Sequence, residues 1–240
     1  METQLTLDIL PQPDGFTCGP TCLQAVYRYY GDKVSLEQVI AEVPRLEDGG
    51  TLDVLLACHA LRRGYQAKIF TYNVQMFDPT WFGPRPFNPA PIKEGLRKQM
   101  EFKKSPKLAV ATEAYLEFLD RGGVLRFDDL TTGLIRKYLN RGIPLLTGLS
   151  STYLYRSARE YGPAQEFDDV RGVPSGHFVV LCGYDATNRQ VLVADPLGNN
   201  PVSASNPYPV SIDRVIGAIL LGIITYDANL LMIEPPKTPK

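Results

Sequence analysis

The sequence predicts an α+β fold, in which helices come first and a mostly antiparallel sheet follows. Up to about residue 140 most apolar side chains recur at helical spacing, whereas short apolar or alternating segments dominate the remainder. Strands and helices do not alternate regularly, as they do in folds built from βαβ units. A glycine-rich phosphate loop after a strand is also absent, which disfavours the nucleotide-binding folds.

The first helix, expected over residues 18–31, has the clearest boundaries. Thr17 is a suitable N-cap, Pro20 lies in the first turn, and Gly31 is a suitable residue to end the helix. The other elements expected before residue 73 are helices over 35–43 and 51–63 and a strand over 66–72.

Residues 73–92 change character, because they contain five prolines and four aromatic rings and cannot form a regular element. Two amphipathic helices are expected next, over 91–103 and 106–120. We interpret 73–125 as an insertion in one domain that spans 1–234, and 235–240 as a frayed tail.

The second half of the chain predicts the sheet. A helix over 127–140, introduced by Asp128 and Asp129, leads to a buried strand over 143–149. Residues 151–175 are polar and irregular. The remaining elements expected are two strands of a hairpin, 177–185 and 190–196, a turn or short helix over 211–215, and strands over 218–226 and 229–234.

Composition excludes several classes of protein. Of the 240 residues 44% are hydrophobic, and 25 basic against 26 acidic residues give a net charge of -1. A balanced chain of this kind has no basic field for a phosphate backbone, so we expect no nucleic-acid partner. The longest apolar stretch, 215–224, is too short for a membrane span, and the N-terminus lacks the basic region of a signal peptide. We therefore expect a cytoplasmic protein.

Four cysteines and two histidines are too few and too scattered for a disulfide scaffold or a zinc finger. The spacing of Cys18 and Cys22 does not match a CxxC motif, and the adjacent Cys58 and His59 do not match a known zinc ligand pattern. We therefore expect no metal.

Cys18 is the candidate nucleophile. It lies at the N-terminal end of a predicted helix, where the positive end of the dipole favours a thiolate. Gln12 is six residues upstream, before a Pro-Asp-Gly turn that can bring its amide back beside the thiol. The Gln12 amide and the backbone N–H of Cys18 would then bind an oxyanion. The alternative is that Cys18 is a small buried hydrophobe, as we expect for Cys22 and Cys182.

The base must be a histidine, and His177 begins a strong strand, whereas His59 is expected on a helix face. If the following hairpin turn is centred on Ala186, His177 lies directly opposite Asp195, which can orient the imidazole. A slip of one residue would move Asp195 to the other face of the sheet. The alternative is that Asp195, which precedes Pro196, only ends its strand.

Four pieces in this order, Gln12, DGFTCGPT, GHFVVLCGYD and VLVADP, resemble the papain-like cysteine peptidases. Within that group the chain is most similar to the double-glycine leader peptidases that process bacteriocins, and to their stand-alone relatives. The resemblance covers residues 10–65 and 127–225. It implies a papain-like fold with an N-terminal helical lobe and a sheet lobe. It further implies that Gln12 donates to the oxyanion, Cys18 attacks, His177 is the base and Asp195 orients it, with no cofactor.

The chain departs from these leader peptidases in two ways, since it has no membrane segment and residues 73–125 have no counterpart. We expect a cysteine peptidase or amidase that hydrolyses a peptide or related amide. One alternative is an acyltransferase similar to phytochelatin synthase or transglutaminase, and another is a catalytically silent peptide-binding module. We further expect Trp81 and Phe82 of the proline-rich loop to border the substrate cleft, rather than to pack on the surface elsewhere.

Overall fold

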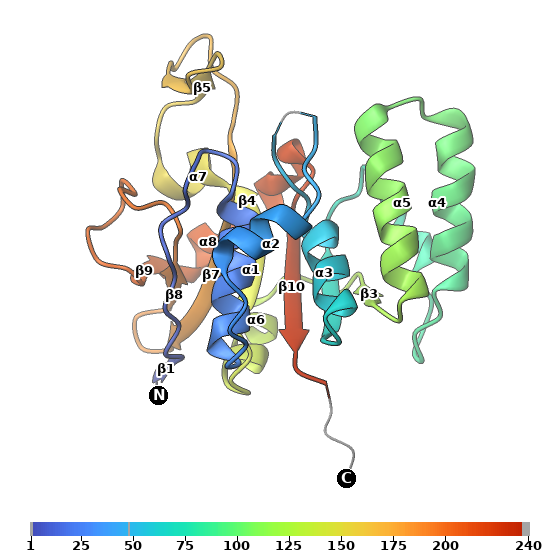
Figure 1. Cartoon of the computed structure of the whole chain (residues 1–240), viewed down its shortest axis with the longest axis horizontal. Helices are drawn as coiled ribbons and strands as arrows, with labels where there is room; N and C mark the ends of the chain where they lie inside the picture. The colour runs from blue at the N-terminus through green and yellow to red at the C-terminus, as the bar shows by residue number, and fades with distance from the viewer. Residues whose placement is uncertain (1, 48, 237–240) are drawn as a thin grey trace.

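An eight-stranded sheet runs through the molecule, which is described by a computed structural model over residues 2–47 and 49–236 (Figure 1). The strand order is β3-β2-β10-β4-β7-β8-β9, and β1 pairs with β7 beyond this path. Every pair is antiparallel except β2 with β3. The strands are β1 (Glu2–Gln4), β2 (Gln66–Thr71), β3 (Val124–Arg126), β4 (Leu145–Ser150), β7 (Gly176–Asp185), β8 (Gln190–Ala194), β9 (Tyr208–Ser211) and β10 (Asn229–Glu234).

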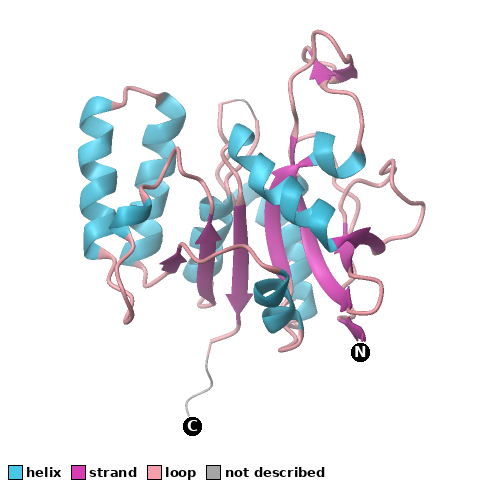
Figure 2. Ribbon diagram, turned by 180° about the vertical axis from the view of Figure 1, so that it is seen from behind, coloured by secondary structure: helices cyan, strands magenta, loops and turns pink. Residues whose placement is uncertain are grey.

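Helices cover both faces of this sheet. Figure 1 shows α1, α2 and α3 in front of it, and Figure 2 shows α6 and α8 on the opposite face. The helices are α1 (Cys18–Tyr29), α2 (Leu36–Glu42), α3 (Asp53–Arg62), α4 (Ala90–Phe102), α5 (Pro106–Asp120), α6 (Thr132–Leu139), α7 (Ser151–Tyr155) and α8 (Ile212–Leu221), with short 3-10 turns η1 (Pro79–Trp81) and η2 (Gly222–Thr225). The predicted α+β class is confirmed.

The first three helices begin and end close to where the sequence predicts. Gly31 and Gly64 follow α1 and α3 with φ of 82° and 85°, a conformation that glycine adopts without steric cost. Ser35 accepts a hydrogen bond from the Gln38 amide and so caps α2. The expected cap of α1 differs, because the Thr17 hydroxyl makes no capping hydrogen bond with the helix and accepts instead from the Asp14 amide at 3.3 Å.

The segment 73–125 forms a helical unit at the β3 end of the sheet, drawn in green in Figure 1. Its helix α5 packs against α3, and α4 packs against α5. Phe77 anchors the proline-rich loop, because its buried ring lies 4.7 Å from that of Tyr115 on α5. The assignment of 73–125 as an insertion within one domain remains a prediction, and residues 237–240 of the predicted tail lie outside the described part of the chain.

Several observed elements differ from those expected, and β9 is among the strands that were not predicted. The helix expected over 127–140 begins only at Thr132, because Thr131 caps it by accepting from the Leu134 amide. The three residues of β3 were not predicted, since so short a strand depends on its parallel partner β2. Residues 151–175 also contain more structure than expected, namely α7 and a small hairpin of β5 (Glu160–Tyr161) and β6 (Glu166–Phe167).

The strand expected over 218–226 is wrong, because this segment forms the end of α8 followed by η2. Its continuous apolar run is compatible with either structure. The helix is favoured because Ile212, Val215 and Ile219 recur at helical spacing and are fully buried against the sheet. The consequence matters for the site, since η2 and the turn after it bring residues 224–227 to the cleft described below.

Candidate active site

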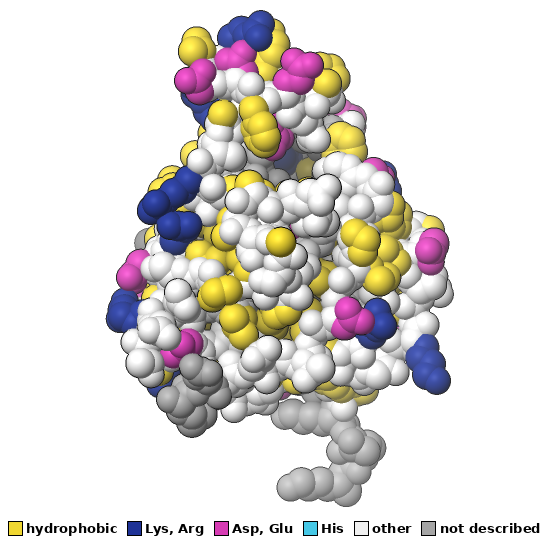
Figure 3. Space-filling model, turned by 90° about the vertical axis from the view of Figure 1, so that its left-hand side faces the viewer, with side chains coloured by type: hydrophobic (Ala, Val, Ile, Leu, Met, Phe, Trp, Pro, Cys, Tyr) yellow, Lys and Arg dark blue, Asp and Glu magenta, His cyan; other side chains and the backbone are white. Residues whose placement is uncertain are grey.

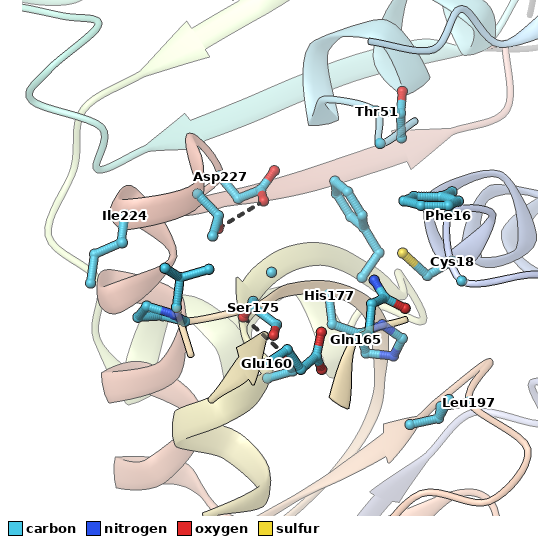
Figure 4. Close-up of a pocket in the computed structure, with 18 of the residues that line it drawn as sticks. Phe16, Cys18, Thr51, Glu160, Gln165, Ser175, His177, Leu197, Ile224 and Asp227 are labelled. Atoms are coloured by element: carbon cyan, nitrogen blue, oxygen red, sulfur yellow. Dashed lines mark hydrogen bonds between the residues drawn. The ribbon is translucent and has the colours of Figure 1, made fainter. Parts of the chain in front are cut away.

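A cleft of about 520 Å³ opens where the N-terminus of α1 meets the start of β7. Figure 4 shows Cys18 and His177 at one end of it and Asp227 and Ile224 toward the other. The small hairpin β5–β6 stands over the cleft and contributes Glu160 and Gln165. Figure 3 shows this hairpin as a projection at the top of the molecule that carries both apolar and charged side chains. The arrangement places three of the predicted residues, Gln12, Cys18 and His177, in the lining of one cleft.

Cys18 is the first residue of α1 and a free, half-buried thiol. A hydrogen bond stabilises the start of this helix, in which the Thr21 hydroxyl donates to the Thr17 carbonyl at 2.7 Å. Gly19 allows this end of the helix to approach its neighbours, since a Cβ there would lie 2.6 Å from the Thr51 side chain. The Cys18 side chain is hydrogen-bonded to His177. The structure therefore brings together the predicted nucleophile and the predicted base.

His177 is buried on β7, opposite Leu149 of β4. Its Nε2 atom lies 2.8 Å from Oδ1 of Asp195, which leaves Nδ1 for the contact with Cys18. Burial disfavours the charged imidazole, but the hydrogen bonds with Asp195 and Cys18 and their negative charges outweigh it and raise the pKa of His177 to about 10. This geometry favours the charged, imidazolium form of His177 beside the Asp195 carboxylate.

Asp195 reaches His177 by a register that differs from the predicted one. The ladder pairs Val180 with Ala194, so its next step places Asp195 level with Val179 and not with His177. Residues 177 and 179 share a face of the strand, so the side chains still meet along a diagonal. The predicted pairing is wrong by two residues, because the turn lies later than Ala186.

A β-bulge decides on which face Asp195 lies. Close to the turn the pairs are Asp185 with Gln190 and Gly183 with Leu192, and the register shifts between Leu181 and Gly183. Without that shift, the same ladder would place Asp195 level with Val180, on the face away from His177. The extra residue of the bulge therefore returns the carboxylate to the face that carries the imidazole.

Two tyrosines that the sequence analysis did not single out also bind Asp195. Tyr155 at the end of α7 and Tyr208 at the start of β9 donate to Oδ2 at 2.8 Å and 2.6 Å. The Leu197 amide donates to Oδ1 at 2.9 Å, and the Asn206 side chain bonds to both the N–H and the carbonyl of Asp195. No sequence signal indicated these partners, because one lies in a segment read as irregular and the other in a strand that was not predicted.

Gln12 lines the same cleft as Cys18. Its side-chain amide donates to the Asp14 carbonyl at 2.7 Å, and its backbone N–H donates to the Pro196 carbonyl at 2.8 Å. Asp14 in turn accepts from the Phe16 amide, which forms the turn expected between Gln12 and Cys18. One hydrogen of the Gln12 amide is thus occupied within this turn.

The other cysteine and histidine side chains lie elsewhere. His59 is buried on α3, with Nδ1 2.8 Å from the Tyr27 hydroxyl and Nε2 2.9 Å from Glu42. Cys22 and Cys182 are buried, and their thiols donate to backbone carbonyls, as expected for core residues. Across the described part of the chain, His, Cys, Asp and Glu side chains nowhere gather in threes as a metal site requires.

Sequence comparison finds a family similarity in the middle and later part of the chain. Residues 111–213 match the Peptidase_C39 like family, and this segment contains both His177 and Asp195. The resemblance to C39-like cysteine peptidases is confirmed. With it the predicted class of enzyme, a cysteine-type peptidase, is confirmed as well. Among curated proteins, none matches the chain.

Solved structures extend this C39-like resemblance to the whole fold. A putative C39-like peptidase from Bacillus anthracis is 14% identical, with 100% of both chains covered and a TM-score of 0.53. A double glycine motif protease from an AMS/PCAT transporter, in complex with the leader peptide, is 15% identical over 97% of this chain and 94% of its own, with a TM-score of 0.46. Xylellain, a cysteine protease from Xylella fastidiosa, is 14% identical over 98% and 85%, with a TM-score of 0.46. The full-length match to the Bacillus anthracis structure, together with the helices and the mostly antiparallel sheet described above, shows that this chain has the papain-like fold. Within residues 2–47 and 49–236, no helix has the length and apolar character needed to cross a membrane.

Trp81 and Phe82 do not lie where the sequence analysis expected them. Neither side chain lines the cleft that contains Cys18 and His177. The indole of Trp81 lies on α4, so close that a Cβ at Gly95 would be 2.4 Å from it, and Phe82 contacts Phe77 and Phe127. The aromatic loop therefore packs the helical unit together. The same segment reaches the cleft through Lys107 at the start of α5.

This packing predicts the effect of Trp81→Ala. We expect the free energy of unfolding to fall by about 1–3 kcal/mol, because a large half-buried ring is lost. The KM for a cleaved peptide should stay within about twofold. Gly95→Ala is the matched variant, because its added methyl group displaces the same indole. It should also lower the free energy of unfolding and leave KM unchanged. Chemical denaturation and steady-state kinetics measure both effects, and a tenfold rise in KM at unchanged stability would contradict this placement.

Proposed function

We propose that the chain hydrolyses a peptide or related amide through an acyl-enzyme formed on Cys18. The observation that carries this proposal is the continuous contact from Cys18 to His177 in the cleft and on to the buried Asp195. A free thiol at a helix N-terminus beside a charged imidazole is the environment in which cysteine becomes a nucleophile. The C39-like fold supports the same assignment.

The first half of the reaction forms the acyl-enzyme. The Cys18 thiolate attacks the carbonyl carbon, and the carbonyl oxygen becomes an oxyanion. The backbone N–H of Cys18, which has no partner within α1, and the second hydrogen of the Gln12 amide are the candidate donors to it. The Nδ1–H of the His177 imidazolium then protonates the leaving amine as the carbon–nitrogen bond breaks.

The second half releases the product. Water enters the cleft, and the now neutral His177 removes its proton while the water oxygen attacks the thioester. The carbon–sulfur bond breaks, the carboxylic acid leaves, and the thiolate and imidazolium are restored. Throughout both steps, Asp195 keeps Nε2 of the imidazole occupied and so presents Nδ1 to the thiol and substrate.

A peptide library incubated with the protein, followed by mass spectrometry of products and protein, tests the proposal. We expect cleaved peptides and a protein mass increased by an acyl group that maps to Cys18. Cleavage that persists in Cys18→Ala would contradict the assignment of the nucleophile. If added amines divert the acyl group at the expense of hydrolysis, the chain is an acyltransferase. Stable peptide binding without a covalent adduct would indicate a silent binding module.

A further inference from the structure

The carboxylate of Asp195 accepts four hydrogen bonds, two on each oxygen. Oδ1 accepts from the Leu197 amide and faces Nε2 of His177, and Oδ2 accepts from the hydroxyls of Tyr155 and Tyr208. An ionised carboxylate has about four acceptor positions, so all of them are occupied. Asp195 is 1% exposed, so water does not compete with these donors.

The two hydroxyls are permanent donors. Burial, followed by the charge of Asp195, raises the pKa of both tyrosines well above the ordinary value. Each therefore keeps its proton and donates it to Oδ2 across the range of pH in which His177 titrates. Tyr208 is fully buried and absent from the lining of the cleft, so it influences the reaction only through Asp195.

We propose that Tyr155 and Tyr208 are positioning residues, which hold Asp195 by Oδ2 and limit the negative charge that Oδ1 presents to His177. This inference rests on the proposed Cys18–His177–Asp195 arrangement. It adds two side chains that set how readily the His177 imidazolium gives up its proton. Two hydroxyl donors draw charge toward Oδ2, which makes Oδ1 a weaker acceptor and the imidazolium a better acid. The imidazolium must lose its proton to the leaving amine, so a bond to Asp195 that is too strong would slow this step.

The expected direction follows from the charges. Removing one hydroxyl leaves more charge on Oδ1, which stabilises the imidazolium, so His177 should lose its proton at higher pH. A tyrosine whose ring only fills space has a different signature, because phenylalanine keeps the ring and the midpoint of His177 then does not rise. The titratable groups that face this pair or share its cleft are Cys18 and Cys22 of α1, Glu160 of β5, Lys107 of α5 and Asp227 after η2.

Nitrogen NMR of the imidazole rings measures this directly, because the chain has only two histidines. Burial lowers the pKa of His59 below the ordinary value, whereas that of His177 is raised to about 10, so the two titrations separate. We expect the His177 midpoint to rise by about half to one pH unit in Tyr208→Phe, and further when Tyr155→Phe is added. Tyr153→Phe on the same helix as Tyr155, with no bond to Asp195, is the matched control.

An unchanged or lower midpoint in a folded Tyr208→Phe protein would overturn the inference. Should that variant not fold, placing 3-fluorotyrosine at position 208 decides the question, because its more acidic hydroxyl is a stronger donor. The midpoint should then fall, and a rise or no change would overturn the inference. Failure of the proposed function is distinguishable, since a protein without peptidase activity can still show these titration shifts.

Discussion

Replacing Cys18 by alanine is expected to lower kcat/KM for peptide hydrolysis by roughly 10⁴ or more, because no other group can form the thioester. The free energy of unfolding should change by about 1 kcal/mol or less. Cys18 is half-buried at the first position of α1, and its main polar contact is with His177. Loss of activity without loss of structure is the signature of a nucleophile and not of a core residue.

Cys22→Ala is the control for this prediction, since it removes a thiol one helical turn further along α1. Cys22 is buried, and its thiol donates to the Phe178 carbonyl at 3.2 Å. This variant should keep most of the activity and lose about 1–2 kcal/mol of stability. Peptide kinetics and urea denaturation on both proteins provide the comparison. If Cys18→Ala keeps more than a few per cent of the wild-type rate, Cys18 is not the nucleophile.

Helix boundaries were predictable where one residue determines them. The glycines at 31 and 64 adopt positive φ, and Ser35 caps α2. The residues at these boundaries therefore determine where one element ends and the next begins. The run 218–226 was not predictable in the same way. A continuous apolar segment suits a strand or a helix, and only its packing against β4 and the close turn at Gly222 decide for α8.

The site was predictable to the level of residue types and their order, but not to its geometry. Cys18, His177 and Asp195 make contact in the predicted order and Gln12 lines the same cleft as Cys18. Asp195 reaches His177, however, only because a bulge near Cys182 corrects the ladder. Gly183, a glycine inside the strand, lies at this bulge and is its one local signal, but a glycine alone does not determine the register. Tyr155 and Tyr208 were missed for a similar reason, since both contact Asp195 from elements that are distant in the chain.

Asp195→Ala is the second variant with a large expected effect. It removes the partner of His177 and leaves the Leu197 amide and both tyrosine hydroxyls as buried donors without their acceptor. We expect the free energy of unfolding to fall by about 3–5 kcal/mol, as when one partner of a buried charged pair is removed. The value of kcat/KM should fall by roughly 10³, because the imidazole loses both its orientation and its counter-charge.

Asp195→Asn separates orientation from charge and stays informative if the alanine variant does not fold. The Leu197 amide cannot accept a hydrogen bond, so the new NH₂ group must turn away from Oδ1, toward the tyrosine hydroxyls, which can rotate to accept. The amide oxygen then keeps its bond to Nε2 of His177, while the negative charge that raises the pKa of the imidazole is lost. We therefore expect more activity than in the alanine variant and a clearly lower pH midpoint for His177. Kinetics and imidazole NMR test both parts, and wild-type activity together with an unshifted midpoint would show that Asp195 does not act on His177.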